Sequence, residues 1–209
     1  MGRVFITFEG IDGSGKSTQA AMLVARLREV GVDVVATREP GGTQLGEQVR
    51  SILLETVPVA PWPEAALFAA ARAQLVADVI RPALDAGRWV VSDRYLDSSL
   101  AYQGVARGLG IDAVLALNGP AVANTLPAWT FVLDVPPEEA AARLTGDRLD
   151  RIEEEGLAFL AAVAAGYAEL AGRYPGRIVT ISGVGSVQST AERVEARLRT
   201  LAPGLMLEE

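Results

Sequence analysis

The chain has 209 residues, of which 50% are apolar and 22% charged, so we expect a single globular domain with a sizeable core. It contains no cysteine and no histidine, which excludes disulfides, thiolate nucleophiles, imidazole metal ligands and Ser-His-Asp triads. The net charge of −7 argues against a nucleic-acid partner, and any metal must be a hard cation with oxygen ligands, Mg²⁺ first. Because no apolar run is long enough for a membrane span or a signal peptide, we expect a cytoplasmic protein without a membrane partner.

Predicted strands alternate with predicted helices along the whole chain. Short apolar and β-branched runs indicate strands at 3–9, 32–38, 88–93, 128–135 and 176–182. Helical periods and turn residues indicate helices at 16–30, 40–54, 61–87, 111–124, 136–144, 152–174 and 190–201. The helix at 61–87 should bend or break before Pro82, because proline lacks the N–H of a regular helix. The alternation predicts an α/β domain over residues 1–209, in which helices cover both faces of a five-stranded parallel sheet.

Residues 10–17, GIDGSGKS, match the phosphate-binding pattern G-x-x-x-x-G-K-[ST] between the first predicted strand and the next helix. Glycines in this P-loop let backbone N–H groups surround a phosphate, and the helix N-terminus adds its positive dipole end. The chain has 19 Lys plus Arg residues, and Lys16 is its one lysine. A compact ammonium can follow a phosphate as it moves, whereas the planar fork of arginine would not fit the tight turn. The pattern predicts a nucleoside triphosphate site, with Ser17 as a Mg²⁺ ligand.

Charged residues follow the second and third predicted strands. Asp93 and Arg94 end the third strand, at the carboxyl edge where open α/β sheets bind ligands. Asp93 could hold Mg²⁺ and Arg94 could bind a second phosphate, although the two could also cap the strand as a charge pair. Arg38 follows the second strand at the same edge and is a weaker signal.

An arginine-rich loop at about 143–152 interrupts the helical pattern. It carries Arg143, Arg148 and Arg151, and such a loop can close over phosphates as a lid and exclude water. A solvated helix junction with ion pairs to neighbouring aspartates would also fit. Together with the P-loop, the loop favours phosphoryl transfer over simple hydrolysis, because a kinase must keep water from its acceptor.

Five motifs in this order resemble thymidylate kinase, of the P-loop nucleoside monophosphate kinase group: FEGIDGSGKST (8–18), TREPGGT (37–43), FAAARAQ (68–74), DRY…SSLAYQG (93–104) and LDRIE (149–153). The resemblance covers about residues 3–200. It implies the reaction ATP + dTMP → ADP + dTDP with Mg²⁺, a step toward dTTP for DNA synthesis. It also implies the P-loop NTPase fold with strand order 2-3-1-4-5 and a homodimer.

The resemblance implies roles for single residues. The ATP phosphates would be bound by Gly10, Ile11, Asp12, Gly13, Ser14, Gly15, Lys16, Ser17 and Thr18. The dTMP would be bound by Asp12 at its sugar or phosphate, Arg38 and Arg94 at its phosphate, Phe68 and Arg72 at thymine, and Tyr102 at the deoxyribose, with Ser98, Ser99 and Gln103 as nearby candidates. The i,i+4 spacing of Phe68 and Arg72 places both on one helix face, although Phe68 alone would be taken for a core aromatic.

Gly13 stands where some members of the family carry an arginine. The chain therefore resembles the bacterial class whose catalytic arginine comes from the lid, with Arg148 as the first choice beside Lys16, Arg94 and Asp12. A kinase for another nucleoside monophosphate and a motor ATPase remain as alternatives. A switch GTPase does not, since its N-K-x-D signature would need a second lysine.

Overall fold

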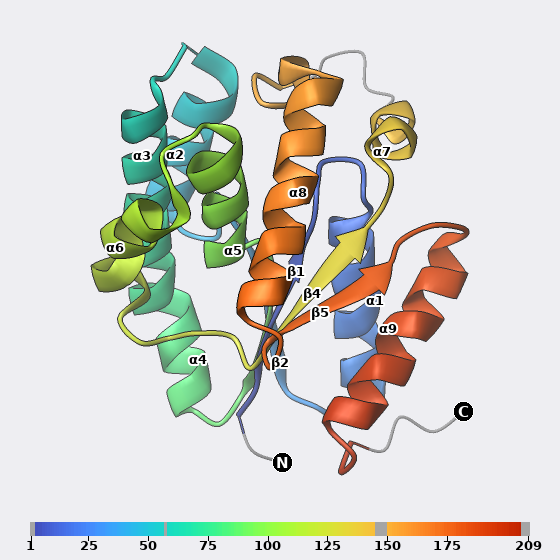
Figure 1. The fold of residues 1–209 in the computed structure, drawn as a ribbon. Helices are drawn as coiled ribbons and strands as arrows, with labels where there is room; N and C mark the ends of the chain where they lie inside the picture. The colour runs from blue at the N-terminus through green and yellow to red at the C-terminus, as the bar shows by residue number, and fades with distance from the viewer. Residues whose placement is uncertain (1–2, 57, 145–149, 206–209) are drawn as a thin grey trace.

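Five parallel strands form the centre of the computed structural model, which describes residues 3–56, 58–144 and 150–205 (Figure 1). The strands are β1 (Phe5–Glu9), β2 (Val34–Arg38), β3 (Trp89–Asp93), β4 (Trp129–Asp134) and β5 (Ile178–Ser182). Their order is β2-β3-β1-β4-β5, and every neighbouring pair is parallel. The predicted strand order and parallel pairing are therefore confirmed.

Helical segments connect the strands. The α-helices are α1 (Lys16–Glu29), α2 (Gln44–Ser51), α3 (Pro61–Leu75), α4 (Arg81–Asp85), α5 (Leu96–Ser99), α6 (Ile111–Val122), α7 (Pro137–Arg143), α8 (Leu157–Arg173) and α9 (Val187–Leu201). Wider π-type turns form η1 (Ile52–Thr56), η2 (Val76–Ile80) and η3 (Leu100–Ala106), and a 3-10 turn forms η4 (Glu153–Glu155). Among the described residues, no helix has the length and apolarity that crossing a membrane would require.

The strand side chains alternate between two apolar layers. In β1, Ile6 and Phe8 pack in the layer of α1 and α9, whereas Phe5 packs in the layer of α3, α5, α6 and α8. Figure 1 shows these two groups of helices on opposite sides of the sheet. The prediction of helices on both faces is confirmed, since the alternation of period two gives each strand two buried sides.

The structure moves the start of one predicted helix, adds a helical segment that was not predicted, and alters a third helix before Pro82. The helix expected from residue 152 begins at Leu157, because Gly156 takes a left-handed φ of 83° that ends η4. Residues 96–106, for which no element was predicted, form α5 and η3. Before Pro82, where a bend or break was expected, the wider π-type turn η2 interrupts the α-helical pattern while its flanking residues keep helical dihedrals.

The carboxyl ends of the neighbouring strands β2, β3 and β1 lie at the same edge of the sheet. In the register of the sheet, Asp93 at the end of β3 is opposite Phe8 of β1 and Arg38 of β2. The P-loop leaves β1 at this edge, so the predicted phosphate-binding residues and the predicted acceptor residues come together here.

Candidate active site

A cavity of about 580 Å³ opens at this edge, which is large enough for small-molecule ligands. Its walls come from the P-loop, the end of β2, α3, the segment after β3, the base of the lid and the turn before α9. Sequence-predicted residues on the walls are Asp12, Gly13, Ser14, Gly15, Lys16, Ser17, Thr18, Arg38, Phe68, Asp93, Arg94, Ser98, Ser99, Tyr102, Gln103 and Arg143. Gly10, Ile11, Arg72 and Arg151 are not among the lining residues.

Glycine at the centre of the P-loop is required by the packing of α7. Gly13 has a φ of 81°, and a Cβ added there would lie 2.1 Å from the carbonyl oxygen of Ala140. Gly10 and Gly15 also have positive φ values, of 138° and 90°. The loop can therefore turn its backbone N–H groups toward a phosphate, and a side chain at Gly13 would collide with α7.

Lys16 is held under the loop in an environment that disfavours its charge. Its side chain is 6% exposed; Nζ donates to the carbonyl oxygen of Ile11 at 2.8 Å and lies 3.9 Å from Asp12 Oδ1. Burial and the nearby Arg94 charge lower the pKa of Lys16 to about 8, although Asp12, Asp93 and Glu9 oppose the change. A bound phosphate would supply the missing negative charge and stabilise the ammonium.

Ser17 and Asp93 provide oxygen ligands that fit Mg²⁺. The Ser17 hydroxyl donates to Asp93 Oδ2 at 2.5 Å, which joins the start of α1 to the end of β3. Asp93 Oδ1 is buried without a hydrogen-bond partner among the described residues. An unsatisfied carboxylate oxygen beside a hydroxyl suits a hard cation that takes its other ligands from phosphates and water.

Asp12, Arg94, Ser98 and Tyr102 form one hydrogen-bonded network. Arg94 contacts Asp12 through Nη2, and the same nitrogen donates to Tyr102 Oη at 3.1 Å. Tyr102 Oη donates to Asp12 Oδ2 at 2.8 Å, and Arg94 Nη1 donates to Ser98 Oγ at 2.9 Å. Burial opposes ionisation of Asp12, but the Arg94 and Lys16 charges outweigh it and hold the pKa of Asp12 below its ordinary value. The network therefore presents one fixed guanidinium to the cavity.

Of the two residues predicted to contact thymine, Phe68 and Arg72, only Phe68 lines the cavity. Phe68 lines the cavity, but Arg72 is 1% exposed and lies behind its wall. Arg72 Nη2 pairs with Glu39 Oε2 at 2.6 Å and donates to Ser99 Oγ at 3.0 Å. Nη2 also donates to the Tyr95 carbonyl at 3.0 Å, and Arg72 Nη1 donates to Asn118 Oδ1. A direct contact of Arg72 with a base remains a prediction.

Comparisons with known proteins decide the family. A sequence model described as thymidylate kinase matches residues 8–194 of this chain. The chain belongs to the thymidylate kinase family. It is 44% identical over 202 residues to a thymidylate kinase of Symbiobacterium thermophilum, covering 96% of this chain and 94% of that protein. It is 46% identical over 204 residues to one of Desulforudis audaxviator, covering 96% and 92%. The crystal structure of thymidylate kinase from Ehrlichia chaffeensis matches with a TM-score of 0.80 at 33% identity, covering 95% and 99% of the two chains, and confirms the fold.

The predicted lid arginines of this thymidylate kinase family member lie in different places. Arg143 lines the cavity, pairs with Glu139 at 2.6 Å and donates to the Gly183 carbonyl at 3.0 Å. Arg151 is directed elsewhere: it pairs with the buried Glu64 at 2.5 Å and donates to the Leu53 carbonyl at 2.8 Å. Arg148 lies outside the described residues. Of the two described lid arginines, Arg143 alone lines the cavity.

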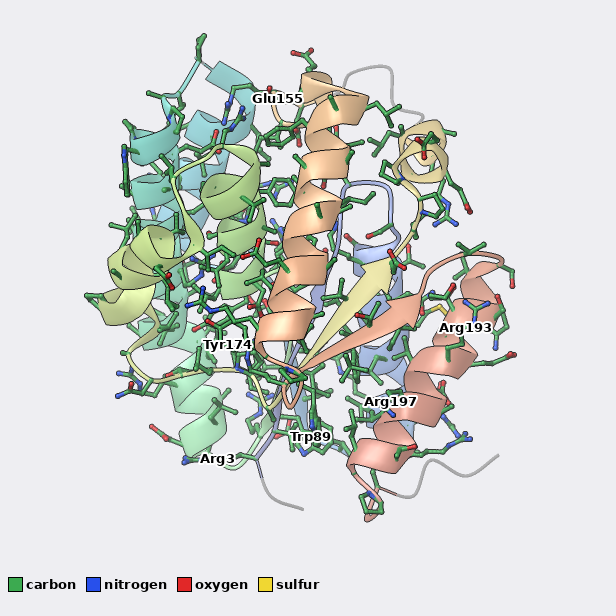
Figure 2. The ribbon with its side chains drawn as sticks, viewed as in Figure 1. Arg3, Trp89, Glu155, Tyr174, Arg193 and Arg197 are labelled. Carbon is green, nitrogen blue, oxygen red and sulfur yellow. The ribbon has the colours of Figure 1, made fainter. Side chains whose placement is uncertain are left out.

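The C-terminal end of the lid is joined to α3 and η3 by ion pairs and hydrogen bonds around Glu64. Glu64 also accepts from Gln103 at 2.8 Å and pairs with Arg107 at 3.3 Å, and Arg107 pairs with Glu155 at 2.6 Å. Figure 2 shows Glu155 at the end of the molecule opposite Trp89, the first residue of β3. The Arg151 contacts therefore lie at the same end as the cavity, outside its wall.

Sequence reasoning gave no role to four charged residues of the cavity wall: Glu39, Arg50, Asp150 and Glu153. Glu39 lines the cavity, and its buried Oε1 has no hydrogen-bond partner among the described residues. Burial raises the pKa of Glu39, although the Arg72 charge opposes the change. Arg50 also lines the cavity and donates to the Pro40 carbonyl at 3.1 Å. The signal for Glu39 was its position beside Arg38, which is itself half-exposed and pairs with Glu47 at 2.8 Å.

Proposed function

We propose that this chain transfers the γ-phosphoryl group of ATP to dTMP, giving ADP and dTDP, with Mg²⁺ held by Ser17 and Asp93. The observation that carries the proposal is that a P-loop with a buried lysine and the network around Arg94 share one cavity. The family membership supports the same reaction. Each half of the cavity can bind one phosphorylated substrate, and the two phosphates meet between Lys16 and Arg94.

The residues of the site would act by position and charge. Backbone N–H groups of the P-loop and Lys16 bind the ATP phosphates, while Arg94 and Arg38 bind the dTMP phosphate. Mg²⁺, when bound, neutralises negative charge on the ATP phosphates. Asp12 orients Arg94 through its ion pair. The dTMP phosphate oxygen is already ionised at neutral pH, so the acceptor needs no general base.

The dTMP base and sugar would lie between Phe68 and Tyr102. Phe68 provides an aromatic face, Ser99 and Gln103 provide polar atoms on the same wall, and Tyr102 stands beside the sugar position. Arg72 would support this wall through its bonds to Ser99 and Glu39. This arrangement favours a pyrimidine deoxyribonucleotide over a purine nucleotide by size and over a ribonucleotide by contact with the 2′ position.

The lid, at about 143–152 within a single domain of residues 1–209, would close on the phosphates. Arg143 would supply positive charge from its near end, and Arg148 remains the prediction from sequence for the catalytic arginine.

A homodimer and a cytoplasmic location also remain predictions. Leu45, Ile52 and Trp62, exposed on α2, η1 and α3, support a dimer through this layer, and light scattering of a Trp62→Asp variant would test it.

A coupled ADP-release assay with Mg·ATP tests the proposal. We would compare dTMP with dUMP, UMP, CMP, AMP and GMP, with a blank that lacks an acceptor and a sample that contains EDTA. We expect release that depends on dTMP, is much weaker with the ribonucleotides and is lost with EDTA. Equal release in the blank would refute phosphoryl transfer and indicate an ATPase, whereas full activity in EDTA would refute the Mg²⁺ site alone.

A further inference from the structure

Glu9 is a buried carboxylate directly behind the active site, with no part in the reaction proposed above. It is the last residue of β1 and is 0% exposed. Its Oε1 accepts from the backbone N–H of Tyr95 at 2.8 Å. Its Oε2 accepts from the Ser98 hydroxyl at 2.5 Å and from the Tyr167 hydroxyl at 3.0 Å. Glu9 is absent from the residues that line the cavity, so it would act on a substrate only through its neighbours.

The first neighbour is the backbone of Arg94. Arg94 has a φ of 70°, a left-handed conformation that is unfavourable for a residue with a side chain. Such a conformation persists only when surrounding bonds fix it. The Arg94 N–H donates to the Phe8 carbonyl at 2.9 Å, the Ser92 hydroxyl donates to the Arg94 carbonyl at 2.7 Å, and Glu9 holds the next N–H. Glu9 therefore supplies one of the three bonds that fix this turn.

The second neighbour is the side chain of Arg94. Ser98 Oγ, which donates to Glu9, accepts from Arg94 Nη1 at 2.9 Å. The guanidinium and the carboxylate also attract each other, since the Arg94 charge acts to lower the pKa of Glu9. One carboxylate thus contacts both the backbone turn after Arg94 and the hydroxyl that holds its guanidinium.

We propose that Glu9 is a positioning residue for Arg94, and that its carboxylate sets where the guanidinium meets the phosphate of dTMP. This inference rests on the proposed function, in which Arg94 binds that phosphate. A positioning role differs from a purely structural role, because only the positioning role predicts an effect on dTMP binding that depends on the ionisation of Glu9.

Glu9 changes its charge near neutral pH. Burial, and next the Asp97 charge on α5, raise the pKa of Glu9 to about 7, while Ser98, Arg94 and Tyr167 oppose the change. The charged and titratable groups that act on it from the packed elements are Asp97 (α5), Arg94 (after β3), Tyr167 (α8), Lys16 (α1) and Arg177 (before β5). Protonation would turn one accepting oxygen into a donor, so the hold on Arg94 weakens as the pH falls below about 7.

Glu9→Gln tests the inference, because glutamine keeps the shape and one accepting oxygen but removes the charge. We expect the KM for dTMP to rise by about tenfold near pH 8, with the KM for ATP changed by less than about twofold. The ratio of variant to wild-type KM for dTMP should shrink toward about pH 6, because wild-type Glu9 becomes protonated there. The titration of the dTMP phosphate occurs with both proteins and cancels in this ratio.

Glu64→Gln is the matched control. Glu64 is also 0% exposed and ion-paired, but its ion-pair partners are Arg107 and Arg151, and it reaches the cavity wall through Gln103 rather than through Arg94. Any effect of this variant on the KM for dTMP should be the same at all pH values. If the Glu9→Gln ratio is close to one, or is constant with pH as for the control, the inference is overturned.

Two further variants separate the possible failures. If Arg94→Ala leaves the KM for dTMP unchanged, the proposed role of Arg94 is wrong and the inference falls with it. If Arg94→Ala raises that KM but Glu9→Gln does not, only the inference fails. Should Glu9→Gln not fold, Ser98→Ala decides, because it cuts the link to the Arg94 side chain and leaves Glu9 in place. A ratio of Ser98→Ala to wild-type KM for dTMP that is close to one, or constant between about pH 6 and pH 8, would then overturn the inference, and a raised ratio that shrinks toward pH 6 would support it.

Discussion

Replacing Lys16 by methionine should make the ligand-free protein more stable while abolishing catalysis. The pKa of Lys16 falls from 10.5 to about 8, because the side chain is buried and lies near Arg94. At about 1.4 kcal/mol for each pKa unit, this difference corresponds to a destabilisation of about 3 kcal/mol at pH 7. Methionine has a similar length and no charge, so it should relieve this destabilisation.

The sign of the pH dependence follows from proton binding. Between about pH 8 and 10.5 the unfolded chain holds a proton on Lys16 that the folded protein has released. Stability from this group therefore rises with pH across that window, and the destabilisation is complete below about pH 8. The gap in stability between Lys16→Met and wild type should be largest at pH 7 and small near pH 10.

Urea unfolding without nucleotide, followed by tryptophan fluorescence at about pH 7 and pH 10, measures this gap. Burial raises the pKa of Tyr95, Tyr102 and Tyr167, so these tyrosines ionise near pH 10 only when the chain unfolds, but this happens in both proteins and cancels in the difference. Lys16→Arg keeps the charge and should show no gain in stability. The reasoning is refuted if Lys16→Met is no more stable than wild type at pH 7, or if the gap is equally large at both pH values.

Three more predictions concern the cavity and its surroundings. Gly13→Ala should lower stability by more than about 2 kcal/mol and abolish ATP binding, because the new methyl group would meet the Ala140 carbonyl; thermal unfolding and nucleotide titration measure both, and a wild-type melting temperature would contradict the P-loop packing. Arg143→Met should lower kcat by about a hundredfold, whereas Arg151→Met should lower stability with a smaller effect on kcat, because Arg151 is ion-paired outside the cavity. Steady-state rates and thermal unfolding of the two variants compare them, and the reverse ranking would show that Arg151 serves the phosphates. Tyr102→Phe should lower kcat/KM for dTMP by about tenfold at an unchanged KM for ATP, and equal losses for both substrates would argue against its place beside the acceptor.

The sheet and the P-loop could be predicted from sequence because their signals are local. Each strand is a short apolar run, and the pattern around Lys16 fixes a strand, a turn and a helix start together. The strand order needed the resemblance, since a period of two does not say which strands pair. Asp93 and Arg38 were placed at the same sheet edge from parallel pairing alone, and the register confirms that they are opposite each other.

The remaining features depend on how distant segments pack. Arg72 lies behind the cavity wall because Glu39, 33 residues earlier, meets it there, and helical spacing alone could not reveal that partner. The segment that forms α5 and η3 shows no clear apolar period, because Asp97, Ser98 and Ser99 turn polar side chains into the interior. The sequence around Arg94 does not indicate a left-handed backbone, because long-range hydrogen bonds hold that conformation in place. One of them is donated by the Arg94 N–H to the Phe8 carbonyl.

Because Lys16 is the one lysine of the chain, any reaction specific for lysine side chains reports on the nucleotide site. A protease that cuts after lysine has one peptide bond to attack, between Lys16 and Ser17, and amine reagents have one side chain to modify. Lys16 is 5% exposed and stands at the first turn of α1, so either reaction requires the phosphate loop to open. The rate of cleavage at this bond therefore measures local opening of the nucleotide site without any label, and a bound nucleotide should slow it in proportion to its occupancy.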